Sequence, residues 1–276
     1  MATVKLWPGG LSGGHAPDAS TARPGKRGKV NGWSASAARR NLAFLWSVNP
    51  DEMFGDGWAV TLTVAEAPDT ADEWTAARAT WLQACRDAGV TRYHWVTEWT
   101  KRGVPHTHAA VYGENPAMVG ALLLAWLRIA DARGWVVNTR GQHIVPIGGL
   151  SGWLQYVSKH ASRGVRHYQH EGAPEGWEKT GRLWGYGGDW PIEEPEVLEL
   201  SSHQYVVFRR LVWDWMLADM ERREVDAEFV TSTRARWADP EHGNAHGVAG
   251  WIPGDVAYAL YRAAKDAAPA DHPWET

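Results

Sequence analysis

Two neighbouring segments with strand-like alternation constrain the fold of this chain more than any other feature. Residues 91–99 alternate between an aromatic-rich face and a face that carries His94 and Glu98. Residues 100–103 (Thr-Lys-Arg-Gly) form a turn signal, and residues 104–112 again have the composition of a strand. A turn of this kind between two strand-like segments predicts a β-hairpin.

Further segments of both types surround the predicted hairpin. Residues 58–64 are β-branched and strand-like, and short strands are expected at residues 143–147 and 181–187. Helices are expected at residues 33–46, at 70–88 with Thr70 as the cap, at 115–133 with Asn115 as the cap, and at 151–162. Strands separated by helices, some joined as hairpins, predict an α+β fold with a central antiparallel sheet flanked by helices.

The 276 residues correspond to about 1.8 domains at roughly 150 residues each, which favours one large domain with appendages. Residues 1–32 are rich in Gly, Pro and Ser and are expected to form a flexible basic arm. Residues 33–190 hold the α+β pattern. Residues 191–276 are expected to form a mainly helical C-terminal extension, with a long amphipathic helix over about 202–225.

Composition excludes several classes of protein. Cys85 is the only cysteine, so a disulfide scaffold is excluded. The longest charge-free apolar run covers the 11 residues 117–127, whereas a membrane-spanning helix needs about 20. No secretory signal is apparent at the N-terminus, and no phosphate-binding loop pattern occurs. We therefore expect a cytoplasmic protein without membrane contact and without ATPase or helicase activity.

Charge is distributed unevenly along the chain. The net charge is −4, yet residues 1–50 carry seven Lys or Arg against one acid, and residues 183–230 carry eleven acids against four arginines. Such asymmetry can hide a basic working surface on an acidic protein. The 19 tryptophans could also stack on unpaired bases, although most should belong to the core.

A candidate metal site lies on the predicted hairpin. His106 and His108 stand two positions apart on one strand, so both imidazoles face the same way, about 6.6–6.8 Å apart along the chain. The turn can bring Glu98 of the preceding strand beside them. Two imidazoles and a carboxylate can hold a divalent ion; the carboxylate favours Mn²⁺ or Mg²⁺, and the imidazoles also admit Zn²⁺. The alternative is a pair of surface histidines, and His94 is expected to be a packed histidine of the sheet.

A candidate nucleophile lies on the predicted helix 151–162. At about 100° per residue, Tyr156, Lys159 and Arg163 share one polar face. The Tyr156 phenol is a poor nucleophile near pH 7 because tyrosine has a free pKa of about 10, and the Lys159 ammonium or a metal at the target phosphate would help it. The alternative is an ordinary amphipathic helix with an exposed lysine.

Taken in order, these pieces resemble a known family. Thr61-Leu62-Thr63, the Glu98…Pro105-His106-Thr107-His108 segment and Tyr156-x-x-Lys159 are similar to the three motifs of the HUH endonucleases. Within that superfamily they resemble the rolling-circle replication initiator (Rep) proteins of plasmids and phages. The likeness covers about residues 33–190, including the basic segment with Arg39 and Arg40.

The resemblance implies a sequence-specific nickase in which residues 33–190 form the catalytic domain. His106, His108 and Glu98 would hold Mn²⁺ or Mg²⁺. Tyr156 would attack the scissile phosphate of single-stranded origin DNA, leaving a covalent 5′-phosphotyrosine and a free 3′-OH, and the same chemistry would later rejoin the strand. Lys159 would stabilise the phosphate charge or assist Tyr156.

The resemblance also implies partners. Arg163, Arg166, Arg39 and Arg40 are candidates for contacts with the DNA backbone. A host helicase would unwind the duplex and a host DNA polymerase would extend the 3′-OH. Only one tyrosine matches the nucleophile, so a replication round could end through a second subunit of a homodimer or through an activated water.

Several alternatives stay open. The chain could be another single-tyrosine HUH enzyme, either a transposase or a relaxase. It could also be a non-catalytic origin-binding protein with the same fold. A His₂-carboxylate oxygenase or hydrolase acting on a small molecule is the remaining option.

Overall fold

The computed structural model describes residues 1–15, 32–147, 153, 173–177, 179–238 and 247–267. The chain divides into two compact units. The larger unit comprises Pro24–Leu45 and Pro50–Pro191, and the smaller unit comprises Met1–Arg23, Trp46–Asn49 and Ile192–Thr276.

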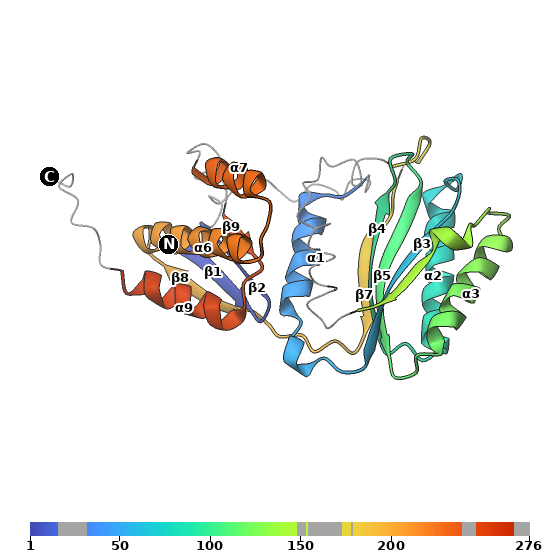
Figure 1. Ribbon diagram of the computed structural model, residues 1–276, viewed down its shortest axis with the longest axis horizontal. Helices are drawn as coiled ribbons and strands as arrows, with labels where there is room; N and C mark the ends of the chain where they lie inside the picture. Colours follow the sequence, from blue (N-terminus) through green and yellow to red (C-terminus); the bar gives the residue numbers. More distant parts are fainter. Residues whose placement is uncertain (16–31, 148–152, 154–172, 178, 239–246, 268–276) are drawn as a thin grey trace, which may run out of the picture. The chain divides into compact units, whose positions relative to one another are not determined.

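The larger unit is built on a sheet of five antiparallel strands (Figure 1). In order across the sheet these are β6 (His143–Pro146), β3 (Asp56–Thr63), β5 (Pro105–Gly113), β4 (Arg92–Trp99) and β7 (Trp184–Gly188). The predicted hairpin therefore forms the centre of the sheet, as β4 and β5. The α+β prediction is confirmed.

Helices cover both faces of this sheet (Figure 1). α2 (Ala71–Asp87) and α3 (Met118–Asp131) pack on one face, where Trp74, Trp81 and Trp126 join Trp95 and Trp99 of β4 in a continuous core. α1 (Ala35–Ser47) lies on the other face through its residues up to Leu45. Two short 3₁₀ turns complete the described part of the unit, η1 (Pro50–Glu52) and η2 (Thr139–Gly141).

Local signals fix several of these boundaries. The Thr70 hydroxyl accepts a hydrogen bond from the Glu73 amide and caps α2, as its sequence predicts. Gly103 has a φ of 76°, which suits glycine in the hairpin turn. α3 begins at Met118 rather than at the predicted residue 116, because the Asn115 side chain accepts from the Ala117 amide in a turn before the helix.

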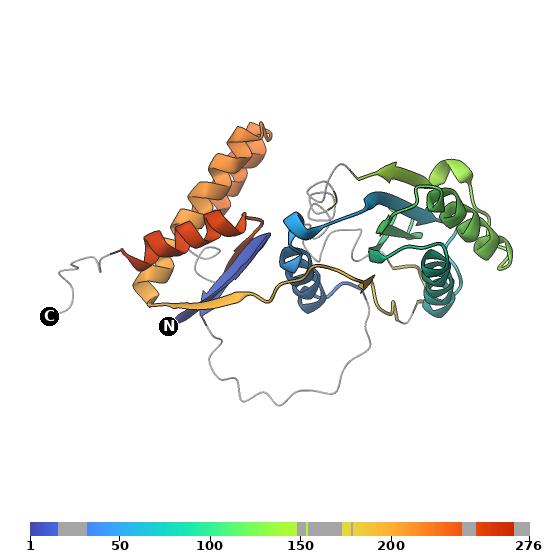
Figure 2. The same cartoon turned by 90° about the horizontal axis from the view of Figure 1, so that it is seen from below.

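The smaller unit contains a second antiparallel sheet, in the order β8 (Glu196–Leu200), β1 (Ala2–Trp7), β2 (Gly10–His15) and β9 (Val248–Gly250). α6 (Ser202–Arg222) and α9 (Gly254–Lys265) cover one face of it (Figure 2). α6 begins with a complete capping box between Ser201 and Gln204. α7 (Ala227–Ala238), which the sequence pattern did not predict, follows α6.

The expected flexible arm is wrong for residues 2–15. This segment forms β1 and β2, and Ala2, Val4 and Leu11 are fully buried. The glycines that suggested flexibility permit close packing instead, since a Cβ on Gly10 would collide with the ring of Trp46. Residues 16–31 lie outside the described part of the chain.

The C-terminal extension also differs from its prediction. Its helices α6 and α9 form as expected, but β8 and β9 pair with β1 and β2. The two ends of the chain thus share one core, and the smaller unit joins the expected arm to the expected extension.

Candidate metal centre

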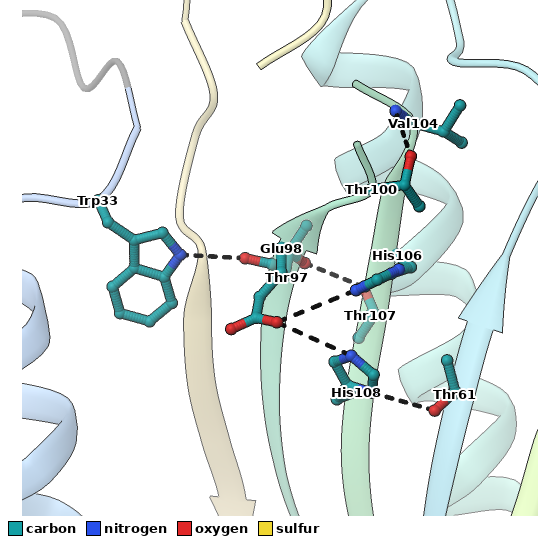
Figure 3. A network of polar contacts seen from close by, with 9 residues as sticks. All are labelled: Trp33, Thr61, Thr97, Glu98, Thr100, Val104, His106, Thr107 and His108. Carbon is teal, nitrogen blue, oxygen red and sulfur yellow. Dashed lines mark hydrogen bonds and ion pairs between the residues drawn. The ribbon is translucent and has the colours of Figure 1, made fainter. Parts of the chain in front are cut away.

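The site is fixed by the register of the two central strands. Glu98 of β4 lies directly opposite His106 of β5, and His108 follows two residues later on the same face. Trp95 and Trp99 of β4 belong to the core on the opposite face. Alternation along each strand therefore places the carboxylate and both imidazoles together on the face that α1 covers (Figure 3).

The three side chains converge closely. Glu98 Oε2 lies 3.9 Å from His106 Nε2 and 3.9 Å from His108 Nε2. One ligand atom from each residue lies within 4.8 Å of the others. The Glu98 side chain is 1% exposed, that of His108 8% and that of His106 15%. The cluster is thus buried, with its most accessible member at His106.

Thr61 of β3 fixes the orientation of His108. The Thr61 hydroxyl oxygen lies 3.0 Å from His108 Nδ1, while Nε2 of the same ring faces Glu98. If Nε2 is a metal ligand, the proton resides on Nδ1 and is donated to Thr61. Partners of this kind set the tautomer and the ring orientation of metal-binding histidines.

The donor set fits a divalent metal ion. His106 Nε2 is buried and makes no hydrogen bond within the described residues. Ions such as Zn²⁺ and Mg²⁺ lie about 2.0–2.2 Å from nitrogen and oxygen ligands, which places neighbouring ligands roughly 3.0–3.4 Å apart. Small side-chain rotations would close the present distances to that range. The buried Glu98–His106–His108 group can therefore hold a metal ion.

A buried polar network supports the same strands from the core side. The Thr97 and Thr107 hydroxyl oxygens are 2.9 Å apart, and the Arg78 guanidinium donates to Thr97 Oγ1 at 3.1 Å and to the Arg182 carbonyl at 3.1 Å. Burial, with the nearby Arg182 charge, lowers the pKa of Arg78 to about 9. Trp33 Nε1 donates to the Thr97 carbonyl at 3.1 Å (Figure 3). Residues adjacent to Glu98 and His106 are thus held rigidly.

His94 is a packed histidine, as expected. Its Nε2 lies 2.8 Å from the Asn41 side-chain oxygen, and its ring stacks on Phe44 of α1. Complete burial lowers the pKa of His94 to about 3, so the ring is neutral near pH 7. The buried Trp153 ring packs edge-on against His94, with centroids 5.9 Å apart. Trp153 therefore lies on the same face of the sheet as the cluster.

The remaining predicted site residues have different outcomes. Arg39 and Arg40 are exposed on α1, where Arg40 donates to Ser36 Oγ. Four others lie outside the described residues and stay predictions: Tyr156, Lys159, Arg163 and Arg166. Tyr156 follows Trp153 by three positions in the sequence.

Two functional contributions escaped the sequence patterns. Thr61 was recognised only as part of a motif, and its contact with His108 depends on the pairing of β3 with β5. Arg78 resembles any surface arginine of an amphipathic helix, yet it is 4% exposed. Its position among the buried tryptophans of α2 was the available signal.

Comparison with known proteins identifies the family. Residues 57–170 match the model of the replication-associated protein ORF2 family. A protein of Xylella fastidiosa (strain 9a5c) that is named as a replication protein is 42% identical over 272 residues, covering 94% of this chain and 95% of that protein. The chain belongs to the replication-associated protein ORF2 family.

Another relative supports this assignment to the ORF2 family. The replication-associated protein of Pseudomonas phage Pf3 is 37% identical over 236 residues, covering 83% of this chain and 84% of that protein. The resemblance to rolling-circle initiators of phages and plasmids is thereby confirmed, and this ORF2-family protein has a replication initiator role. No solved structure matches the chain significantly. No helix in the described residues is long and apolar enough to cross a membrane.

Proposed function

We propose that this protein initiates rolling-circle replication as a metal-dependent endonuclease and strand transferase acting on single-stranded origin DNA. One observation carries the proposal. The buried Glu98–His106–His108 group lies on the sheet face against which Trp153 packs, three positions before Tyr156 in the sequence. The ORF2-family relatives place such a protein in replication.

The chain's own residues would prepare the phosphate for attack. Glu98, His106 and His108 would hold Mn²⁺ or Mg²⁺, the ions that suit a carboxylate-containing site with open positions. When bound, such an ion supplies Lewis acidity that polarises a phosphoryl oxygen. Thr61 would keep the His108 ring in its ligating tautomer.

Tyr156 would act as the nucleophile. Its phenolic oxygen forms a bond to phosphorus while the bond from phosphorus to the 3′ oxygen breaks. The products are a 5′-phosphotyrosine and a free 3′-OH, which receives the proton. The covalent linkage conserves the phosphodiester, so the strand can later be rejoined by the reverse reaction. Lys159 would stabilise the negative charge on the phosphate or on the phenolate.

The larger unit would carry the DNA contacts. It holds eighteen Lys or Arg against fifteen Asp or Glu, and Arg39, Arg40, Arg163 and Arg166 are its candidates for phosphate contacts. Because the sequence contains no phosphate-binding loop pattern, a host helicase would unwind the duplex, and a host polymerase would extend the 3′-OH. The reaction would take place in the cytoplasm.

The direct test is cleavage of fluorescent single-stranded oligonucleotides tiled across the replicon that encodes the chain. Wild type is compared with Tyr156→Phe and Glu98→Gln, with Mn²⁺, Mg²⁺ or a chelator. Glu114→Gln is the matched control, since Glu114 is an exposed carboxylate after β5. We expect a covalent protein–DNA adduct in wild type and the control, and in neither active-site variant nor with chelator.

Each other outcome has a definite meaning. Cleavage that survives Tyr156→Phe would identify a different nucleophile and refute the assigned role of that tyrosine. Cleavage indifferent to chelator and to Glu98→Gln would refute the metal centre. Binding of one tiled strand without cleavage by wild type would identify a non-catalytic origin-binding protein.

A further inference from the structure

The edge strand β7 presents all its aromatic side chains on one face. Trp184 lies opposite Val96 and Tyr186 lies opposite His94, so both share the sheet face of Glu98. The alternate positions are glycines: a Cβ on Gly185 would lie 2.9 Å from the Trp95 ring, and a Cβ on Gly187 would lie 2.6 Å from the Tyr93 hydroxyl. The glycines let β7 approach the core aromatics closely, while its own rings point to the metal-centre face.

These rings begin one step from the metal centre. Val96, the partner of Trp184, is two residues before Glu98 on β4. Two residues along a strand span about 6.8 Å and adjacent strands lie about 4.8 Å apart, so the α-carbons of Trp184 and Glu98 are about 8 Å apart. A nucleotide whose phosphate is held at the cluster therefore has bases within reach of β7.

The rings form an ordered column with an open side. Tyr186 stacks on Phe44 of α1 with centroids 3.8 Å apart and planes at 12°. Trp184 is 6.3 Å from Tyr186 with planes at 22°. Tyr186 is nevertheless 47% exposed. Phe44 holds one side of the ring, so its orientation is set before any ligand arrives.

We propose that Trp184 and Tyr186 form a stacking platform for unpaired bases of the DNA strand that the metal centre engages. The platform rests on the proposed function, because it assigns the neighbouring subsite of the same substrate. Flat aromatic rings beside a phosphate-binding group match the alternation of base and phosphate in a single strand. Exposed cations accompany the rings, with Arg182 two residues before Trp184, and Arg39 and Arg40 on α1, which packs on this face.

The test separates base stacking from phosphate binding. Fluorescence anisotropy in chelator measures the affinity for a labelled 20-nucleotide oligothymidylate and for a 20-nucleotide strand of abasic residues with equal charge. The variant is Tyr186→Ala. The matched controls are Tyr186→Phe, which keeps the ring, and Tyr258→Ala, which removes a tyrosine of similar exposure (44%) from α9.

We expect Tyr186→Ala to weaken oligothymidylate binding by at least about fivefold, the lower end of a single base–aromatic stack. Binding to the abasic strand should stay within twofold of wild type, as should both controls on both strands. The slope of log affinity against log salt should not change, because stacking releases no counterions.

Several results would overturn the platform. These are an equal loss on both strands, no loss on oligothymidylate, a loss in Tyr186→Phe equal to that in Tyr186→Ala, or a wild type that binds neither strand. The cleavage assay judges the nickase separately. A wild type that nicks but shows no base-dependent loss refutes the platform alone, and a base-dependent loss in a protein that never nicks supports the platform and refutes the nickase.

Discussion

Protonation of His94 should destabilise the fold as the pH falls. His94 Nε2 is committed to the Asn41 side-chain oxygen, and the buried Nδ1 makes no hydrogen bond within the described residues. A second proton would therefore place an unsolvated charge between Phe44 and Trp153. Burial accordingly lowers the pKa of His94 from 6.5 to about 3.

The sign and size follow from linkage. The unfolded chain takes up this proton below pH 6.5, whereas the folded chain does so only near pH 3. The His94 contribution is therefore fully present above pH 6.5 and is lost as the pH falls. Each pH unit in that window costs about 1.36 kcal/mol, so the total approaches about 5 kcal/mol as an upper limit.

Urea unfolding at pH 6.5, 5.5 and 4.5, followed by tryptophan fluorescence, measures this effect. His94→Gln keeps a donor toward Asn41 and removes the titration. We expect the unfolding free energy of wild type to fall by roughly 1 kcal/mol per pH unit more than that of the variant. His143→Gln, at an exposed histidine, should parallel wild type. Parallel pH profiles for wild type and His94→Gln would refute the reasoning.

Three further substitutions test the support around the site. Thr61→Val should weaken Mn²⁺ binding by about 10–100-fold in calorimetric titration, because the His108 ring loses its partner, whereas Thr61→Ser should restore it. Arg78→Met should lower the unfolding free energy by about 2–4 kcal/mol, since its buried acceptors lose their donor. Gly188→Ala should cost about 2 kcal/mol or more in urea unfolding, because Gly188 has a φ of 86° and an added Cβ would collide with a backbone carbonyl. Gly120→Ala in α3, where nothing lies within 4 Å, should instead gain about 0.5–1 kcal/mol.

The sequence predicted the centre of the larger unit well, because its signals are local. Alternation in residues 91–99 and 104–112 is enough to place Glu98, His106 and His108 on one face. Strand geometry then determines their approach, since a four-residue turn leaves little freedom in the register. The site residues with this local logic are the ones that the fold brings together.

The smaller unit was predicted poorly for the opposite reason. β1 pairs with β8 from nearly two hundred residues away, and nothing local in a Gly- and Ser-rich segment reveals such a partner. A flexible arm and a buried strand differ there only in the burial of alternate residues such as Ala2 and Val4. Thr61 and Arg78 were missed likewise, because their partners come from other elements.

The division of charge between the two units bears on how the protein meets DNA. The smaller unit holds ten Lys or Arg against seventeen Asp or Glu, whereas the larger unit has an excess of cations. Attraction to phosphates depends on local cations rather than on net charge. The larger unit, which holds the Glu98–His106–His108 group and the rings of β7, is therefore the one suited to the DNA strand. The acidic unit repels DNA, so the net charge of −4 conceals a nucleic-acid-binding half.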